Sequence, residues 1–173
     1  MKKIINSLLH RMKEDSLAKK MTEAERTKEY KGLESMKHGL VFWVADEQET
    51  TWLNHLADKF PGLKTDKLCL IPDTGQKSAQ EGVIFVRKED LMFGGKIQNE
   101  GLKRVLSENY DILIDLSLVS DVMTDYILKN SQAVCKVGVP KENYEADIML
   151  EGVADTADFI EKLYEVLSKL KKY

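Results

Sequence analysis

The sequence of 173 residues is poor in the features that mark membrane proteins and disulfide-rich proteins. It contains two cysteines and three prolines, and no uninterrupted apolar run reaches the roughly 18 residues that a membrane-spanning helix needs. The first residues, MKKIINSLLHRMKED, begin like a signal peptide, but charged residues end the apolar stretch and no small-residue cleavage site follows. We therefore expect a cytoplasmic protein.

The sequence lacks the histidine spacing of metal sites and the glycine-rich turn of nucleotide sites. His10, His38 and His55 show no metal-ligand spacing. Cys69 and Cys135 lie in the apolar runs KLCLI and AVCKVGV, which is typical of buried, reduced thiols. The turn after the first expected strand, ADEQETT, has no glycine, and no GxxxxGK[ST] pattern occurs. The sequence therefore predicts neither a metal nor a nucleotide cofactor.

The net charge of -3 is unevenly distributed along the chain. Residues 1–38 contain ten basic and six acidic residues, a net +4, which leaves 16 basic and 23 acidic residues, a net -7, in residues 39–173. A basic segment on an acidic body predicts contact with an anionic surface, either the body or a partner, although a solvated helix face has the same pattern. The acidic body and the lack of a recognised binding motif argue against nucleic acid as a partner.

From residue 39 onward, apolar runs typical of strands alternate with segments of helical periodicity. Strands are expected at 39–45, 67–71, 82–86, 111–116, 133–139 and 146–150, with helices at about 48–60, 98–108 and 119–130 and from Asp155 onward. Such alternation builds a mostly parallel sheet with helices on both faces. We predict a three-layer α/β domain over residues 39–173, Rossmann-like or flavodoxin-like, preceded by a basic helical arm over residues 1–38.

Seven residues in the middle of these apolar segments are expected to be buried. They are Val41, Trp43, Leu70, Ile84, Leu113, Val137 and Leu163. Exposure of several of them would mean that the expected elements are out of register.

The arm carries an apolar stripe made of Ile4, Ile5, Leu8, Leu9 and Met12. Leu17, Met21 and Ala24 lie about 150° from this stripe at about 100° per residue, which indicates a bend near residues 13–16. A soluble protein rarely leaves such a stripe in water. The possible covers are the body, a second molecule's arm and a lipid surface, of which the acidic body disfavours an anionic membrane. We expect the arm to pack on protein, with a homodimer favoured over docking within one chain.

Polar side chains follow several of the expected strands, at the edge where open parallel sheets bind ligands. Asp46 and Glu47 follow the first strand, Asp73 follows the second, and Asp115 and Ser117 lie at the end of the fourth. Converging carboxylates would suit Mg²⁺ or general acid and base catalysis. Alternatively, these residues cap the following helices, although Asp115 belongs to a hydrophobic strand and needs a partner if it is buried. We expect Asp46 and Asp115 to lie near each other.

Several stretches resemble known families. GLVFWVADEQE, FGGKIQNEGLKRVLSENYDILIDLS and SQAVCKVGV are similar to a family of short bacterial α/β proteins known only as a domain of unknown function. The segment LKRVLSENYDILIDLS also resembles the acceptor-side Rossmann domain of heptosyltransferase-type glycosyltransferases. Those enzymes have a glycine in the loop after the first strand, which the loop at Asp46 lacks, and they need a second Rossmann domain. This second resemblance therefore does not imply an active transferase.

The sequence shows a conspicuous N-terminal arm but no complete set of catalytic residues. Our leading hypothesis is a non-enzymatic binding or scaffolding protein whose N-terminal helix mediates self-association or docking. The alternative is a small-molecule or sugar-related site, catalytic or vestigial, at the strand ends around Asp46, Asp73, Asp115 and Ser117. An open, acid-lined pocket at these strand ends would favour the alternative, whereas an edge filled by side chains would favour the first hypothesis.

Overall fold

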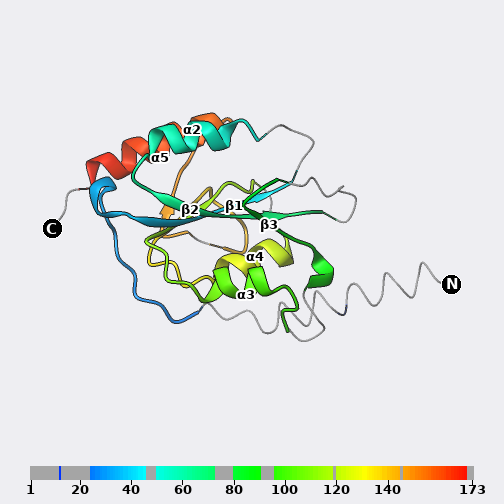
Figure 1. Ribbon diagram of the computed structural model, residues 1–173. Coiled ribbons are helices and arrows are strands. Elements are labelled where there is room, and N and C mark those ends of the chain that lie inside the picture. The colour runs from blue at the N-terminus through cyan, green and yellow to red at the C-terminus, as the bar shows by residue number, and fades with distance from the viewer. Residues whose placement is uncertain are drawn as a thin grey trace.

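The computed structural model describes residues 12, 24–45, 50–72, 80–90, 96–118, 120–144 and 146–170. Its centre is one parallel sheet, which lies between two layers of helices in Figure 1. The strands are β1 (His38–Val44), β2 (Lys64–Leu70), β3 (Val83–Val86), β4 (Ile112–Asp115), β5 (Lys136–Gly138) and β6 (Ile148–Met149). Each of the six predicted strand runs overlaps one of these strands, although β2 begins three residues before the predicted start at residue 67.

The strand order across the sheet is β3-β2-β1-β4-β5-β6. This is the order of the Rossmann fold, so the structure decides between the two architectures that the sequence left open. The order reverses between β1 and β4, where Phe42 lies opposite Asp115. In folds of this kind, ligands bind beyond the carboxyl ends of the strands at such a reversal. We call this side of the sheet the carboxyl edge.

Two helices cover each face of the sheet (Figure 1). α2 (Trp52–Lys59) and α5 (Thr156–Lys169) pack together on one face, and α3 (Glu100–Ser107) and α4 (Val122–Asn130) lie on the other. Three helices begin at a side chain that accepts a backbone N–H, which stabilises the first turn: Asn99 for α3, Asp121 for α4 and Asp155 for α5. Short 3₁₀ turns, η1 (Leu33–Ser35) and η2 (Lys88–Asp90), complete the described elements.

The core divides into two parts because successive side chains of a strand point to opposite faces. Leu40 and Phe42 of β1 face α3 and α4, whereas Val41 and Trp43 face α2 and α5. Six of the seven residues predicted to be buried are buried. Ile84 is only half-buried, because β3 is the edge strand and has a neighbouring strand on one side alone.

Residues 24–37, which we call the strap, run along the amino ends of the strands. The backbone N–H of Ala24 donates to Lys129 O at 2.9 Å, and that of Glu29 donates to Val134 O at 3.0 Å. Residues 24–32 form neither a helix nor a strand, and two of their backbone N–H groups donate to the body. The earlier part of the predicted arm, apart from Met12, lies outside the described residues. Within the described part of the chain, no helix is long and apolar enough to cross a membrane.

Candidate functional site

The structure places two of the five predicted edge residues. Asp115 is the last residue of β4 and Ser117 follows two residues later, both at the carboxyl edge beside the order reversal. Asp46, Glu47 and Asp73 lie outside the described residues. The expected approach of Asp46 to Asp115 therefore stays a prediction.

Asp115 and Ser117 form a cluster with Lys141, which belongs to the connection between β5 and β6. The Ser117 hydroxyl donates to Asp115 Oδ1 at 2.5 Å, and the Ser117 backbone N–H donates to the same oxygen at 2.9 Å. Lys141 Nζ forms an ion pair with Asp115 Oδ2 and donates to Ser117 Oγ at 2.7 Å. Each polar group of the cluster thus has its partner inside the cluster.

The cluster is cut off from solvent. The side chains of Asp115 and Lys141 are each 1% exposed, and Ser117 is 2% exposed. Burial raises the pKa of the Asp115 carboxyl, while Lys141 and the Ser117 hydroxyl favour its charged form. A nucleophile or general base must reach its substrate within hydrogen-bond distance. Because the Ser117 hydroxyl is buried and shared between an acid and a base of the protein, this arrangement closes the part of the edge beside β4 and β5.

Gly138, the last residue of β5, allows this close packing. A Cβ atom added there would lie 3.1 Å from Asp115 Oδ2 and 3.4 Å from Asp115 Cβ. Asp115 is fixed by Ser117 and Lys141, so it cannot move away freely. A residue without a side chain is therefore needed beside the cluster.

We expect Gly138→Ala to lower the free energy of unfolding by about 1–3 kcal/mol through overpacking against Asp115. Gly62→Ala is the matched control, because a Cβ at Gly62 meets nothing within 4 Å. Urea unfolding of both variants measures the difference. Equal stability of the two variants would show that the cluster tolerates an added methyl group.

A small hollow lies on the other side of the carboxyl edge, against α2. It has a volume of about 90 Å³, and its lining includes Trp43, Trp52, Thr50, Gln80 and Thr156. The two tryptophan rings meet edge to face at 5.1 Å between centroids, and Thr50 Oγ1 donates to Gln80 Oε1 at 3.3 Å. The exposed surface of its lining is more polar than apolar, whereas most small-molecule sites have mainly apolar walls with a few polar groups. None of these lining residues belonged to the predicted site.

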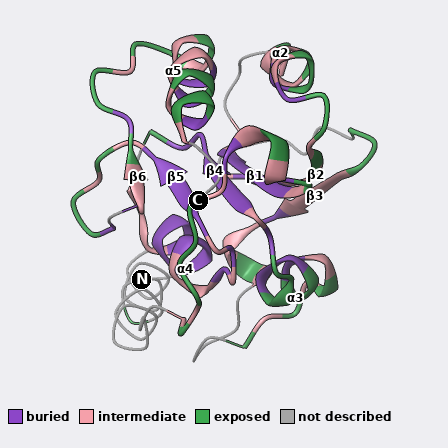
Figure 2. Ribbon diagram, turned by 90° about the vertical axis from the view of Figure 1, so that its left-hand side faces the viewer, coloured by how far each residue is buried: buried purple, intermediate pink, exposed green. Residues whose placement is uncertain are grey.

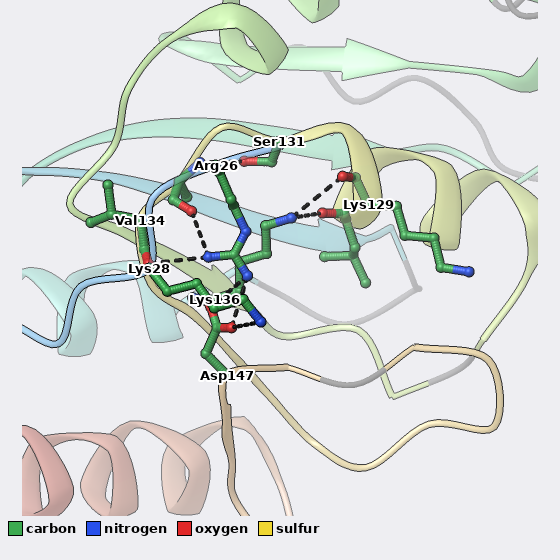
Figure 3. A network of polar contacts seen from close by, with 9 residues as sticks. Arg26, Lys28, Lys129, Ser131, Val134, Lys136 and Asp147 are labelled. Atoms are coloured by element: carbon green, nitrogen blue, oxygen red, sulfur yellow. Dashed lines mark hydrogen bonds and ion pairs between the residues drawn. The ribbon is translucent and has the colours of Figure 1, made fainter. Parts of the chain in front are cut away.

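A second buried network joins the strap to the amino side of the sheet (Figure 3). Arg26 Nη2 pairs with Asp147 Oδ2 at 2.7 Å, and both side chains are 2% exposed. Arg26 Nη1 donates to the carbonyls of Ala133 and Val134 at 3.2 and 3.1 Å. Asp147 also accepts the backbone N–H of Lys136 at 2.8 Å. The network therefore fastens the strap to β5 and to the segment before β6.

Lys136 is a fully buried lysine in the middle of the core. Its ammonium donates to Leu128 O at 2.6 Å, near the end of α4. The last carbonyls of a helix lack partners within the helix and carry partial negative charge, so a cation is stabilising there. Lys136 thereby connects β5 to α4, and this contact explains why a lysine is buried here.

Sequence reasoning missed Lys141, Arg26, Asp147 and Lys136. Asp147 is 121 residues from Arg26 in the sequence, and Lys141 is 26 residues from Asp115. No short sequence motif therefore connects these partners. Lys136 carries the one available signal, since a lysine inside the apolar run AVCKVGV must find a buried acceptor or leave the core.

Asp111, which precedes β4, is the third anchor of the strap. It accepts the backbone N–H groups of Lys37 and His38 at 2.8 and 3.0 Å and the ammonium of Lys31 at 2.6 Å. Burial alone would raise the pKa of Asp111, but these donors hold it below its usual value. The pKa of Asp147 is likewise lowered, because its donors, led by Arg26, outweigh burial.

These shifts predict loss of stability in acid. A carboxyl whose pKa is lower in the folded than in the unfolded chain stabilises the protein above the unfolded value, about 3.9, and this contribution is lost as the pH falls through the folded value. We expect Asp111→Asn to be less stable than the parent at pH 7, with a difference that shrinks toward pH 3. Urea unfolding at several pH values measures this. Asp58→Asn, on the exposed side of α2, is the control; a pH-independent difference for Asp111→Asn would contradict the assignment.

The two cysteines show no sign of reactivity or metal binding in the described part of the chain. Cys69 and Cys135 are buried and form no disulfide, as expected from their apolar runs. Burial raises the pKa of the Cys135 thiol to about 12, which disfavours the reactive thiolate. In the described ranges, no group of three or more His, Cys, Asp or Glu side chains is arranged to hold a metal ion.

Comparison with known proteins identifies the family and nothing more. A model described as a family of unknown function (DUF6913) matches residues 9–170, so this chain belongs to that family. The resemblance to an uncharacterised domain family is therefore confirmed, and the match includes the strap. No curated protein and no solved structure matches the chain, and the comparisons lend no support to the glycosyltransferase resemblance.

Proposed function

We propose that this member of the family is a non-enzymatic, cytoplasmic binding or scaffolding protein whose N-terminal helix mediates self-association or docking. The observation that supports this proposal is the closed Asp115–Ser117–Lys141 cluster. It occupies the carboxyl edge beside the order reversal, where a Rossmann fold holds its ligand. Two buried cysteines that form no disulfide agree with a reducing compartment.

The strap supports a role for the residues that precede it. Arg26, Lys31 and the backbone of Ala24 fix the strap on the body. Ala24, to which residues 1–23 are joined, therefore has a defined place at the end of α4. The apolar stripe in these residues needs a protein cover, which a second copy or the chain's own body can supply.

Light scattering and thermal unfolding of the full chain test the proposal. In one variant, Leu8→Glu and Leu9→Glu place charges on the apolar stripe. In the matched control, Ser7→Glu and His10→Glu place the same charges away from the stripe, at about 100° per residue. A dimeric parent and a monomeric stripe variant would support self-association. An unchanged mass with a lower melting temperature of the stripe variant alone would support docking, and no change in either quantity would contradict both.

The hollow of about 90 Å³ favours a second candidate function. Its place at the carboxyl ends of the strands supports a small-molecule or sugar-related site, catalytic or vestigial, for which Asp46, Asp73, Asp115 and Ser117 are the predicted residues. Thermal unfolding of the full chain with Mg²⁺ and with nucleotide-sugars tests it, because a ligand at 100 times its Kd stabilises the folded state by about 2.7 kcal/mol. A rise in melting temperature that Asp46→Ala abolishes would support this candidate. Unchanged melting with every ligand would count against it.

A further inference from the structure

α4 is buried around its whole circumference, unlike α2, α3 and α5. Residues 123–128 are six consecutive buried residues, and no residue of α4 is exposed. Each of α2, α3 and α5 has exposed residues on its outer side, as Figure 2 shows by colour. A helix that packs on a sheet with one face needs a second cover to be buried on the other.

The outer face of α4 contains a buried carboxylate. Asp125 lies about 160° from both Met123 and Ile127 at about 100° per residue, and those two residues belong to the core under the sheet. Asp125 is nevertheless only 4% exposed, and it accepts a hydrogen bond from Ser120 Oγ at 2.9 Å. Val122 and Tyr126 flank it and provide apolar surface. Lys129 lies about 40° from Asp125 on the same side of α4. The face therefore carries both charges, and it is its apolar surface that fits a helix with an apolar stripe.

The strap brings the N-terminal residues to this face. Ala24 is hydrogen-bonded to Lys129, within the last turn of α4. The nine residues of α4 span about 14 Å, whereas the 15 residues from Leu9 to Ala24 reach up to about 50 Å when extended. The stripe can therefore reach any part of the outer face. Because it is tethered, its effective concentration there is of millimolar order, which favours the chain's own stripe over that of a second copy.

We propose that the outer face of α4 is the docking site of the chain's own N-terminal helix, through Ile4, Ile5, Leu8 and Leu9. Met12 has helical backbone but is 56% exposed, so the contact uses the turns that precede it. This inference rests on the proposed function, because it assigns the docking surface of the same N-terminal helix. It also commits to docking within one chain.

Thiol labelling of the full chain tests this contact. Asp125→Cys places a thiol on the covered face, and Leu118→Cys places one at a residue that is 61% exposed. Iodoacetamide labelling is followed by peptide mass spectrometry, with Cys69 and Cys135 as internal reporters of unfolding. We expect Cys at position 125 to react at least about tenfold slower than Cys at position 118, and to become at least about tenfold faster when Leu8→Glu and Leu9→Glu are added. The Ser7→Glu and His10→Glu pair should leave it slow.

Several outcomes would overturn the inference. Labelling at position 125 that is fast in the parent, or equally slow with and without the stripe substitutions, would mean that the N-terminal helix does not cover α4. If Asp125→Cys itself disturbs the fold, Cys69 and Cys135 will react, and Val122→Cys then replaces it. Stripe substitutions that expose position 125 and also convert a dimer to a monomer would place a second copy's helix on α4. A change in mass without exposure of position 125 would leave the proposed self-association standing but refute this docking site.

Discussion

Replacing Lys141 by methionine is expected to lower the free energy of unfolding by about 3–5 kcal/mol at pH 7, because it leaves the buried Asp115 carboxylate without its cation. Burial already raises the pKa of Asp115, and loss of Lys141 raises it further. The carboxyl of the variant should therefore take up a proton more readily. We expect the loss of stability to shrink as the pH is lowered from 7 toward 5.

Urea unfolding of three variants separates the buried charge from lost packing. Adding Asp115→Asn to Lys141→Met removes the unpaired charge and should restore a large part of the stability. Lys162→Met is the control, since Lys162 pairs with Asp158 on the surface of α5 at 2.8 Å and such pairs contribute about 0.3–0.5 kcal/mol. A cost for Lys141→Met as small as that of the control would contradict a buried, closed cluster.

The second large effect is expected at the strap. Arg26→Met breaks the buried pair with Asp147 and removes the donors to Ala133 and Val134. Asp147 would remain buried with less positive charge beside it, so we expect a loss of about 3–5 kcal/mol. Arg26 connects the strap to residues next to β5 and β6. We therefore expect the loss of stability to appear as a lower free energy of unfolding of the whole domain.

Lys28→Met is the matched control for Arg26→Met. Lys28 Nζ lies 3.1 Å from the same carboxylate, Asp147 Oδ1, but its side chain is 57% exposed. An exposed partner contributes at most about 1 kcal/mol. Chemical unfolding of both variants compares a buried and an exposed contact to one carboxylate. Similar costs for the two substitutions would refute the structural role of the Arg26 network.

The strands and helices could be predicted because burial on both faces leaves a strong sequence pattern. The run DILIDL becomes β4, whose four residues are all buried, and Asp155 begins α5 as its N-cap. The strand order could not be predicted, because Rossmann-like and flavodoxin-like folds share the same alternation of strands and helices along the sequence. Ile84 shows the limit of pattern reasoning, because an apolar run does not reveal that its strand will lie at the edge of the sheet.

The candidate site was only partly predictable. Asp115 was identified because an acid in a hydrophobic strand needs a partner, but its partner Lys141 looked like any lysine of a polar loop. The strap was expected to be helical because its charges and apolar residues fit helical spacing. Contacts with residues 129–134, more than a hundred positions away, instead use two of its backbone donors, and residues 24–32 are not helical.

The central claim is that the Asp115–Ser117–Lys141 cluster closes the part of the carboxyl edge beside β4 and β5, and the reactivity of Lys141 tests it most directly. The folded full chain is treated with an amine-acetylating reagent, and each lysine is followed by peptide mass spectrometry. Lys28 and Lys103 are exposed references, with side chains 57% and 47% exposed. We expect Lys141 to react at least about tenfold slower than these references. Acetylation of Lys141 as fast as that of Lys28, with Cys69 still protected, would show an open edge and contradict the claim.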